Sequence, residues 1–142
     1  MRATITALLI FLSSEVFANT QLCNNNILKH DICAEAKRIA AEEQKNLPYK
    51  MSERVQVLSF AADTNILSLG IKLLYDRAFL ENAIIQQGRS ITDMKRQMFD
   101  NSTQIACEAE TLKAFIDMGG HMRFLYEFMN GKILFEFYVS NC

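Results

Sequence analysis

Near the C-terminal end of the chain, two runs rich in aromatic and branched residues flank the dipeptide Asn130-Gly131. The first run covers residues 123–129 (RFLYEFM), and the second covers residues 132–139 (KILFEFYV). Both central positions of a tight hairpin turn need positive φ, which Asn-Gly tolerates, so the pattern predicts a β-hairpin. Strand side chains alternate between faces, so pairing across a two-residue turn places six side chains on one face, which we predict to be core. These residues are Phe124, Tyr126, Phe128, Ile133, Phe135 and Phe137.

The opposite face of this hairpin has a mixed character. Register from the same turn pairs Arg123 with Tyr138 and Leu125 with Glu136. A face that combines charge with apolar area is either solvated or covered by a partner. We predict that these four residues bind another protein, through this face or through an exposed edge strand as in β-augmentation.

A second alternating pattern occupies the middle of the chain. Val55 and Val57 alternate with their neighbours, and residues 67–73 (LSLGIKL) alternate leucine or isoleucine with serine, glycine and lysine. Residues 63–65 (DTN) have turn chemistry, so the pattern favours a hairpin over residues 55–73. The competing interpretation is one helix over residues 66–87, in which glycine at position 70 would cost about 1 kcal/mol relative to alanine.

A helical pattern precedes this hairpin. Asp31 is a suitable N-cap, and Asn46 with Pro48 ends the pattern. Four apolar residues share one face of this helix: Ile32, Ala36, Ile39 and Ala40.

Two further helices are predicted before the C-terminal hairpin. Ser90 followed by Asp93 approximates a capping box, and a second short helix covers residues 107–118, with Gly119 as a left-handed C-terminal cap. The first of these helices has a buried stripe of Ile91, Met94 and Met98. Together the patterns predict an α+β fold, with an antiparallel sheet of about four strands packed on one face by about three helices.

The first eighteen residues have a different pattern. Arg2 is followed by an apolar run over residues 3–12, and Val16-Phe17-Ala18 offers a small-x-small cleavage site. This layout predicts a secretory signal peptide over residues 1–18, with residues 19–142 as a single exported domain. Lipidation of Cys23 is an alternative, although residues 20–22 (TQL) lack the small residues expected before a lipidated cysteine.

Composition narrows the choice of partners. The formal net charge is −1, which provides no global attraction to nucleic acid or to anionic membranes. The longest later apolar stretch, residues 66–80, is interrupted by Lys72, Asp76 and Arg77, so no integral membrane span is expected. We therefore expect a periplasmic or secreted protein whose partner is another protein.

The four cysteines are even in number and none is spaced as C-x-x-C. In an exported chain they indicate two disulfides with three possible connectivities, of which the sequence-local one is Cys23–Cys33 with Cys107–Cys142. This second bond would tie the C-terminus to the start of the helix over residues 107–118. Free or regulatory thiols are the alternative.

Neither histidine forms part of a recognisable catalytic arrangement. His30 lies near Cys23 and Cys33, but oxidised cysteines could not supply the thiolates that a metal needs. His121 follows Gly119-Gly120 with no nucleophile fixed near it by any motif. Glycine-rich phosphate loops, dinucleotide-binding patterns and hydrolase motifs are absent from the sequence. We therefore predict no catalytic residues, no metal and no cofactor, and a protein that is not an enzyme.

Methionines concentrate in the C-terminal half of the chain. Their flexible thioether side chains recur at adaptable binding surfaces, although they more often fill cores. The residues are Met94, Met98, Met118, Met122 and Met129.

Residues 51–142 resemble the periplasmic quorum-sensing-regulated virulence-factor type of domain. The resemblance rests on a helix with Cys107, a short helix, Gly119-Gly120, and a final hairpin that contains Tyr126, Gly131 and Val139 and ends at Cys142. It implies an exported, virulence-associated bacterial α+β domain and transfers no catalytic residues.

These observations favour a non-enzymatic, exported protein-interaction domain of a Gram-negative bacterium. The first alternative is an accessory, pilotin-like factor of a secretion or conjugation system, which would need a specific apolar groove. A second alternative is a small periplasmic inhibitor or immunity protein.

Overall fold

The computed structural model describes residues 23–25 and 30–142, so the predicted signal peptide and its cleavage site lie outside the described residues. The described strands begin with a short pair, β1 (Asn24–Asn25) and β2 (His30–Asp31). The sheet strands are β3 (Tyr49–Ser52), β4 (Val55–Asp63), β5 (Ile66–Leu73), β6 (His121–Phe128) and β7 (Ile133–Val139). The helices of this described part are α2 (Ile32–Gln44), α3 (Arg77–Gln86), α4 (Ile91–Glu108) and α5 (Glu110–Asp117).

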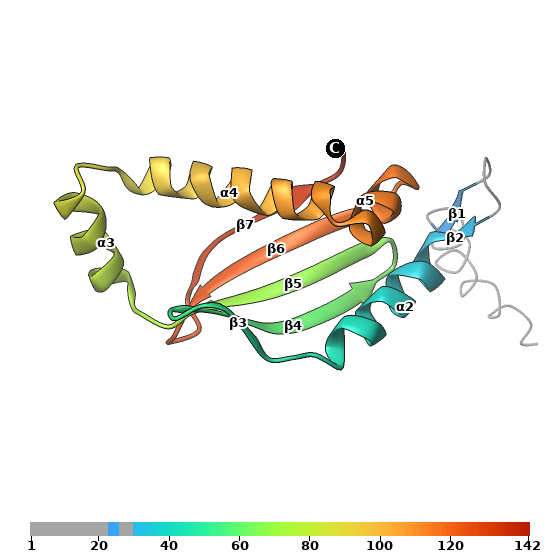
Figure 1. Ribbon diagram of the computed structural model, residues 1–142, viewed down its shortest axis with the longest axis horizontal. Helices are drawn as coiled ribbons and strands as arrows, with labels where there is room; N and C mark the ends of the chain where they lie inside the picture. The colour runs from blue at the N-terminus through green and yellow to red at the C-terminus, as the bar shows by residue number, and fades with distance from the viewer. Residues whose placement is uncertain (1–22, 26–29) are drawn as a thin grey trace, which may run out of the picture.

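The main sheet is mixed and has five strands in the order β3-β4-β5-β6-β7 (Figure 1). All neighbouring strands are antiparallel except β5 and β6, which are parallel. The α+β class is as predicted, but the expectation of about four antiparallel strands and about three helices is wrong. The reason is the connection over residues 74–120, which contains three helices and returns the chain to the starting end of β5, as parallel pairing requires.

The central hairpin is confirmed. β4 and β5 pair around the turn at residues 63–65, where Thr64 has φ 52°. The apolar positions of β5 are buried, and Gly70 lies so close to Ser59 of β4 that a Cβ atom would overlap with the serine hydroxyl. The competing helix over residues 66–87 is wrong for its first half. Helix α3 begins only at Arg77, where the Asp76 carboxylate accepts a hydrogen bond from the Phe79 amide at 2.8 Å.

Helix boundaries follow the predicted caps in most places. The Asp31 carboxylate caps α2 by accepting from the Ala34 amide, and Ser90 and Asp93 form a reciprocal capping box at the start of α4. The prediction that a helix begins at Cys107 is wrong. No glycine or proline interrupts residues 91–108, so α4 continues through Cys107 and α5 follows the extended residue Ala109.

Gly119 ends α5 as predicted. Its φ of +96° is left-handed, its amide donates to the Ile116 carbonyl, and the Gly120 amide donates to the Phe115 carbonyl. These two bonds form a Schellman motif, which turns the chain directly into β6.

The C-terminal hairpin has the predicted register away from its turn. Phe124 pairs with Phe137 and Tyr126 with Phe135, but a bulge then pairs Glu127 with Ile133. The strands end four residues apart rather than two, with the Phe128 amide donating to the Lys132 carbonyl. As a result Ile133 is 55% exposed and Leu134 is 5% exposed, so the predicted core position of Ile133 is wrong.

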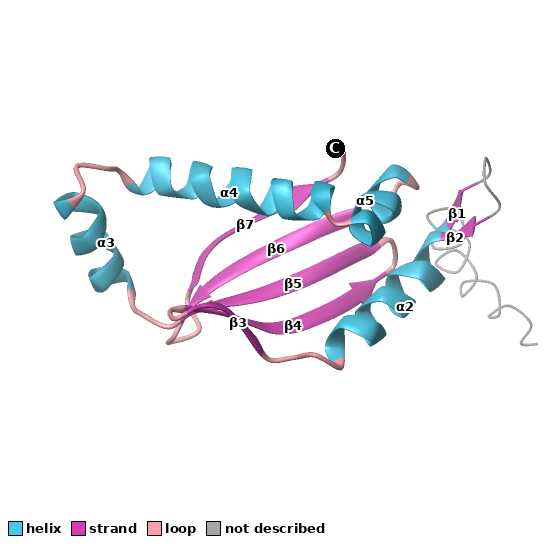
Figure 2. Ribbon diagram, in the orientation of Figure 1, coloured by secondary structure: helices cyan, strands magenta, loops and turns pink. Residues whose placement is uncertain are grey.

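Helices α2, α4 and α5 cover one face of the sheet (Figure 2). α2 packs over β4 and β5, α5 over the start of β6, and α4 runs beside β7. The core between these layers is built mainly from leucine, isoleucine and phenylalanine of β4–β6 and of the inner helix faces. Among the described residues, no helix combines the length and apolar character that a bilayer crossing requires.

Both sequence-local disulfides are present. Cys23 joins Cys33 at the start of α2, and Cys142 joins Cys107. Because Cys107 belongs to the last turn of α4, this bond ties the end of the chain to the end of a helix, rather than to the start of one as expected.

Candidate functional site

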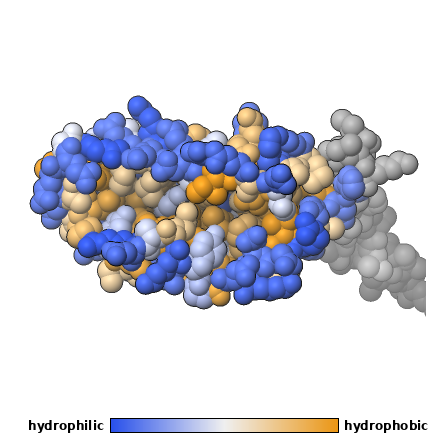
Figure 3. Space-filling view, viewed as in Figure 1, coloured by the Kyte–Doolittle hydropathy of each residue, from blue (hydrophilic) through white to orange (hydrophobic). Residues whose placement is uncertain are grey.

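The helix-covered face of the sheet is only partly covered. Figure 3 shows apolar side chains in a hollowed band between the polar outer surface of α4 and the polar surface along α2 and the β3–β4 edge. We call this concave surface the hollow. The elements on either side of it carry Met94, Met98 and Ile105 (α4), Tyr49 (β3) and Tyr75 (just after β5).

Two contacts fix the orientation of α4. The Ser102 hydroxyl lies 2.6 Å from the Tyr126 hydroxyl of β6, and the Phe99 ring lies 4.9 Å from the Phe137 ring of β7. The side of α4 that faces away from Phe99 therefore overhangs β5 and the centre of the sheet. At 3.6 residues per turn, this side carries four apolar residues: Ile91, Met94, Met98 and Ile105. Three of them are half-buried and Ile105 is exposed, so α4 presents an apolar wall to the hollow.

The opposite boundary is formed by β3 and α2. Tyr49 pairs with Val57 on the helix-covered face, where its ring is partly exposed. Burial, with a contribution from the nearby Glu43 carboxylate, raises the pKa of Tyr49. These contacts place an aromatic edge at the β3 side of the hollow.

α2 carries a row of charges along the side that faces α5. Arg38 donates two hydrogen bonds to Glu35, at 2.6 and 2.9 Å, and the pKa of the Glu35 carboxyl is lowered by this bonding. Two turns further along, the Lys45 ammonium contacts Glu42 at 2.9 Å and lowers the pKa of that carboxyl too. Each pair joins one positive and one negative side chain, so their charges cancel. The α2 wall of the hollow is therefore polar without a strong net charge.

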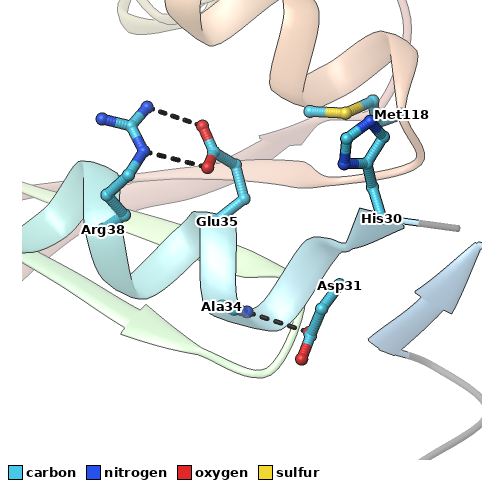
Figure 4. A pocket seen from close by; sticks show the side chains of 6 residues that line it. All are labelled: His30, Asp31, Ala34, Glu35, Arg38 and Met118. Carbon is cyan, nitrogen blue, oxygen red and sulfur yellow. Dashed lines mark hydrogen bonds and ion pairs between the residues drawn. The ribbon is translucent and has the colours of Figure 1, made fainter.

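A pocket of about 440 Å³ lies between the start of α2 and the end of α5 (Figure 4). Its lining combines the Glu35–Arg38 pair with His30, Asp31, Ala34 and Met118. His30 was the histidine expected near the two N-terminal cysteines. Within the described chain, one cluster could offer three metal ligands, Cys23, Asp31 and Cys33. Two of its members form a disulfide and Asp31 caps α2, so in this oxidised state the cluster provides no thiolate ligand.

Aromatic rings and arginines close the other end of the hollow. The Tyr75 ring lies 5.4 Å from Phe79 of α3 and 6.5 Å from Phe128 of β6. Arg54 stacks over Phe79 at 4.5 Å, and Arg77 lies over Phe128 at 5.4 Å. Burial raises the pKa of Tyr75, which keeps its hydroxyl neutral.

The four predicted partner-binding residues lie together on the uncovered face of the sheet. Arg123 donates to Glu136 at 2.7 Å, while Leu125 and Tyr138 occupy neighbouring register positions on β6 and β7. A second cross-strand pair, Lys72–Glu127, lies beside them at 3.7 Å. Arg123, Glu136, Lys72 and Glu127 are thus mutually paired, and a binding role for the four predicted residues stays a prediction.

The two histidines are placed on different elements. His121 begins β6, and its Nδ1 atom lies 2.9 Å from the Ser140 hydroxyl, whereas His30 lies in β2 beside the pocket. The hollow could not be predicted from the sequence, because its concavity depends on how α4 lies over the sheet. The methionine concentration was its one sequence signal, since Met94 and Met98 line it.

Comparison with known proteins finds the same fold in solved structures of low sequence identity. No family model and no curated protein matches the chain. The solved structure of EpsS, the pilotin of the Vibrio vulnificus type 2 secretion system, matches this chain with a TM-score of 0.60 and 18% identity, over 77% of this chain and 87% of that chain. AspS, the type II secretion pilotin of Vibrio cholerae, matches with a TM-score of 0.58 and 15% identity, over 77% and 88%. A solved structure of a Pseudomonas aeruginosa protein, described as a candidate secreted protein, matches with a TM-score of 0.58 and 10% identity, over 77% of this chain and 88% of that chain. At these identities the likeness shows a shared fold.

Proposed function

We propose that this protein is a non-enzymatic, exported accessory factor of a secretion system, similar in role to a pilotin. In this proposal, it binds an apolar segment of another component of that system in the hollow. The observation that carries the proposal is an apolar, methionine-walled hollow on a fold shared with two pilotins. From the sequence, a pilotin-like factor was expected to need a specific apolar groove. The hollow, an apolar and concave surface, is the candidate for that groove.

The chemistry of the walls suggests which segment would fit. Met94 and Met98 offer flexible thioether contacts that adapt to an apolar partner surface. The α2 wall instead presents paired charges, led by Glu35 and Arg38. An amphipathic helix matches both walls, with its apolar face against α4 and the sheet and its polar side toward α2.

Export is supported by the disulfides. Two bonds form in this small domain, and disulfides persist in oxidising compartments such as the periplasm. A periplasmic or secreted location is therefore part of the proposal. The virulence association implied by the resemblance of residues 51–142 remains a further expectation.

Site-specific crosslinking in the native host tests the proposal. A photoreactive amino acid at position 98 should give an adduct with a component of the secretion machinery, identified by mass spectrometry. The matched control is position 85, because Ile85 of α3 is 72% exposed. In parallel, Met98→Glu should fail to restore secretion in a strain that lacks the gene, while Ile85→Glu restores it. Equal crosslinking from both positions, or full complementation by Met98→Glu, would contradict the proposal.

A further inference from the structure

We propose that Arg54 and Arg77 form a carboxylate-binding end to the hollow. In this proposal, the partner helix carries acidic side chains at the end that lies against α3. The inference rests on the proposed function, because it describes the partner of the same hollow. Binding of these acidic side chains at the α3 end would fix the direction in which the partner helix lies in the hollow.

The two guanidinium groups are held in place by aromatic rings. Arg54 lies 4.5 Å from the Phe79 centroid and Arg77 lies 5.4 Å from the Phe128 centroid. Tyr75 contacts both of these rings, so the two arginines belong to one cluster. A guanidinium stacked on a ring keeps its N–H groups in the plane of the fork, where they can donate to a carboxylate.

Backbone contacts support the same cluster. The Arg54 carbonyl accepts from the Leu74 amide at 2.9 Å, and the Tyr75 carbonyl accepts from the Met129 amide at 3.3 Å. The start of β4, the end of β5 and the end of β6 are thereby tied together beneath the rings. Both arginines therefore extend from a fixed corner of the sheet, which reduces the ordering cost of binding.

The guanidinium groups at this corner have few close carboxylate partners. Throughout the described part of the chain, Arg54 has no carboxylate within ion-pair distance, and Arg77 contacts only the exposed Glu81, at 3.6 Å. Asp76 keeps its negative charge, but its carboxylate is engaged as the cap of α3 through the Phe79 amide. By contrast, Arg38 and Arg123 each hold a carboxylate at 2.6–2.7 Å. The Arg54 guanidinium thus has donors that no described carboxylate fills, and an acidic group on the occupant would complement them.

Three model peptides test this inference by fluorescence anisotropy with the exported domain. All are amphipathic helices of about 20 residues, or roughly 30 Å, with the same leucine and methionine stripe. The first ends in Glu-Asp with an amidated C-terminus, the second ends in Gln-Asn with an amide, and the third ends in Gln-Asn with a free carboxylate. The protein variants are Arg54→Gln with Arg77→Gln, and Lys95→Gln as a matched control. Lys95 also lies over a ring, that of Phe135, but on the β7 side of α4.

The wild-type protein should bind the Glu-Asp peptide about fivefold more tightly than the amidated Gln-Asn peptide, as expected for two partly exposed charge contacts. The double arginine variant should bind both equally with an unchanged melting temperature, and Lys95→Gln should retain the preference. Equal binding of all three peptides by the wild type would overturn the arginine site and leave the proposed function standing. An equal gain with the free carboxylate peptide would overturn the choice of acidic side chains. Failure of every peptide to bind would overturn both proposals.

Discussion

The hydroxyl groups of Ser102 on α4 and Tyr126 on β6 lie 2.6 Å apart in the protein core. Ser102 is almost completely buried, and this contact joins the middle of α4 to a central strand. It also turns the methionine side of the helix toward the hollow. A polar contact between two otherwise apolar layers therefore sets the orientation of the proposed binding wall.

Removing one partner of this contact should destabilise the fold. Tyr126→Phe leaves the Ser102 hydroxyl without a partner, which should lower the free energy of unfolding by about 1–3 kcal/mol. Adding Ser102→Ala should recover part of that loss, because neither polar group then remains buried. Urea denaturation of the two single variants and the double variant measures the coupling. Strictly additive losses would show that the hydroxyl contact contributes nothing of its own.

The two faces of the C-terminal hairpin should respond differently to truncation. Phe124 is fully buried and stacks on Phe137 at 5.2 Å, so Phe124→Ala should cost about 3–5 kcal/mol. Phe135 is only half-buried, so Phe135→Ala should cost less. Glu136→Ala breaks only its exposed pair with Arg123 and should cost less than about 1 kcal/mol. Urea denaturation ranks the three variants, and equal losses would contradict the assignment of faces.

The predictions that held are those that depend on local chemistry. Asp31, Ser90 and Gly119 act as caps because each side chain or backbone conformation satisfies orphan groups of a neighbouring helix turn. The alternation in β5 marks its buried face for the same local reason. The bulge at Leu134 was missed because the turn uses four residues, and the extra residue moves Ile133 off the buried face.

The parts that were missed depend on distant segments. Parallel pairing of β5 with β6 follows from a connection of three helices, and its first helix, α3, was hidden because apolar residues continue from the strand into it. The arginine cluster likewise joins Arg54, Arg77 and Phe128, which are far apart in sequence. Neither relation has a periodic signature that a single sequence could show.

The two disulfides should differ in their contribution to stability. In the chain-entropy treatment, removing Cys107–Cys142, with a separation of 35 residues, should cost about 4 kcal/mol, and removing Cys23–Cys33, with a separation of 10, about 3 kcal/mol. Paired cysteine-to-alanine variants measured by urea denaturation provide the comparison. A larger loss from the N-terminal pair would indicate that strain or residual structure outweighs loop length.

Stability should fall at high pH because three tyrosines resist ionisation in the folded protein. Burial raises the pKa of Tyr49, Tyr75 and Tyr126 above 10.0, although the bond to Ser102 partly opposes this shift at Tyr126. The folded state therefore holds these protons more tightly than the unfolded state. Their contribution to stability is complete below pH 10 and declines as the pH rises through the raised values, because the unfolded chain ionises first.

Melting temperatures measured between pH 8 and pH 12, at about unit intervals, test this effect. Tyr75→Phe provides the matched control, since it removes one of the three groups and should make the decline less steep. Absorbance at alkaline pH should also show these three tyrosines ionising above pH 10. Stability that is unchanged through this range would contradict the expected burial of the three hydroxyls.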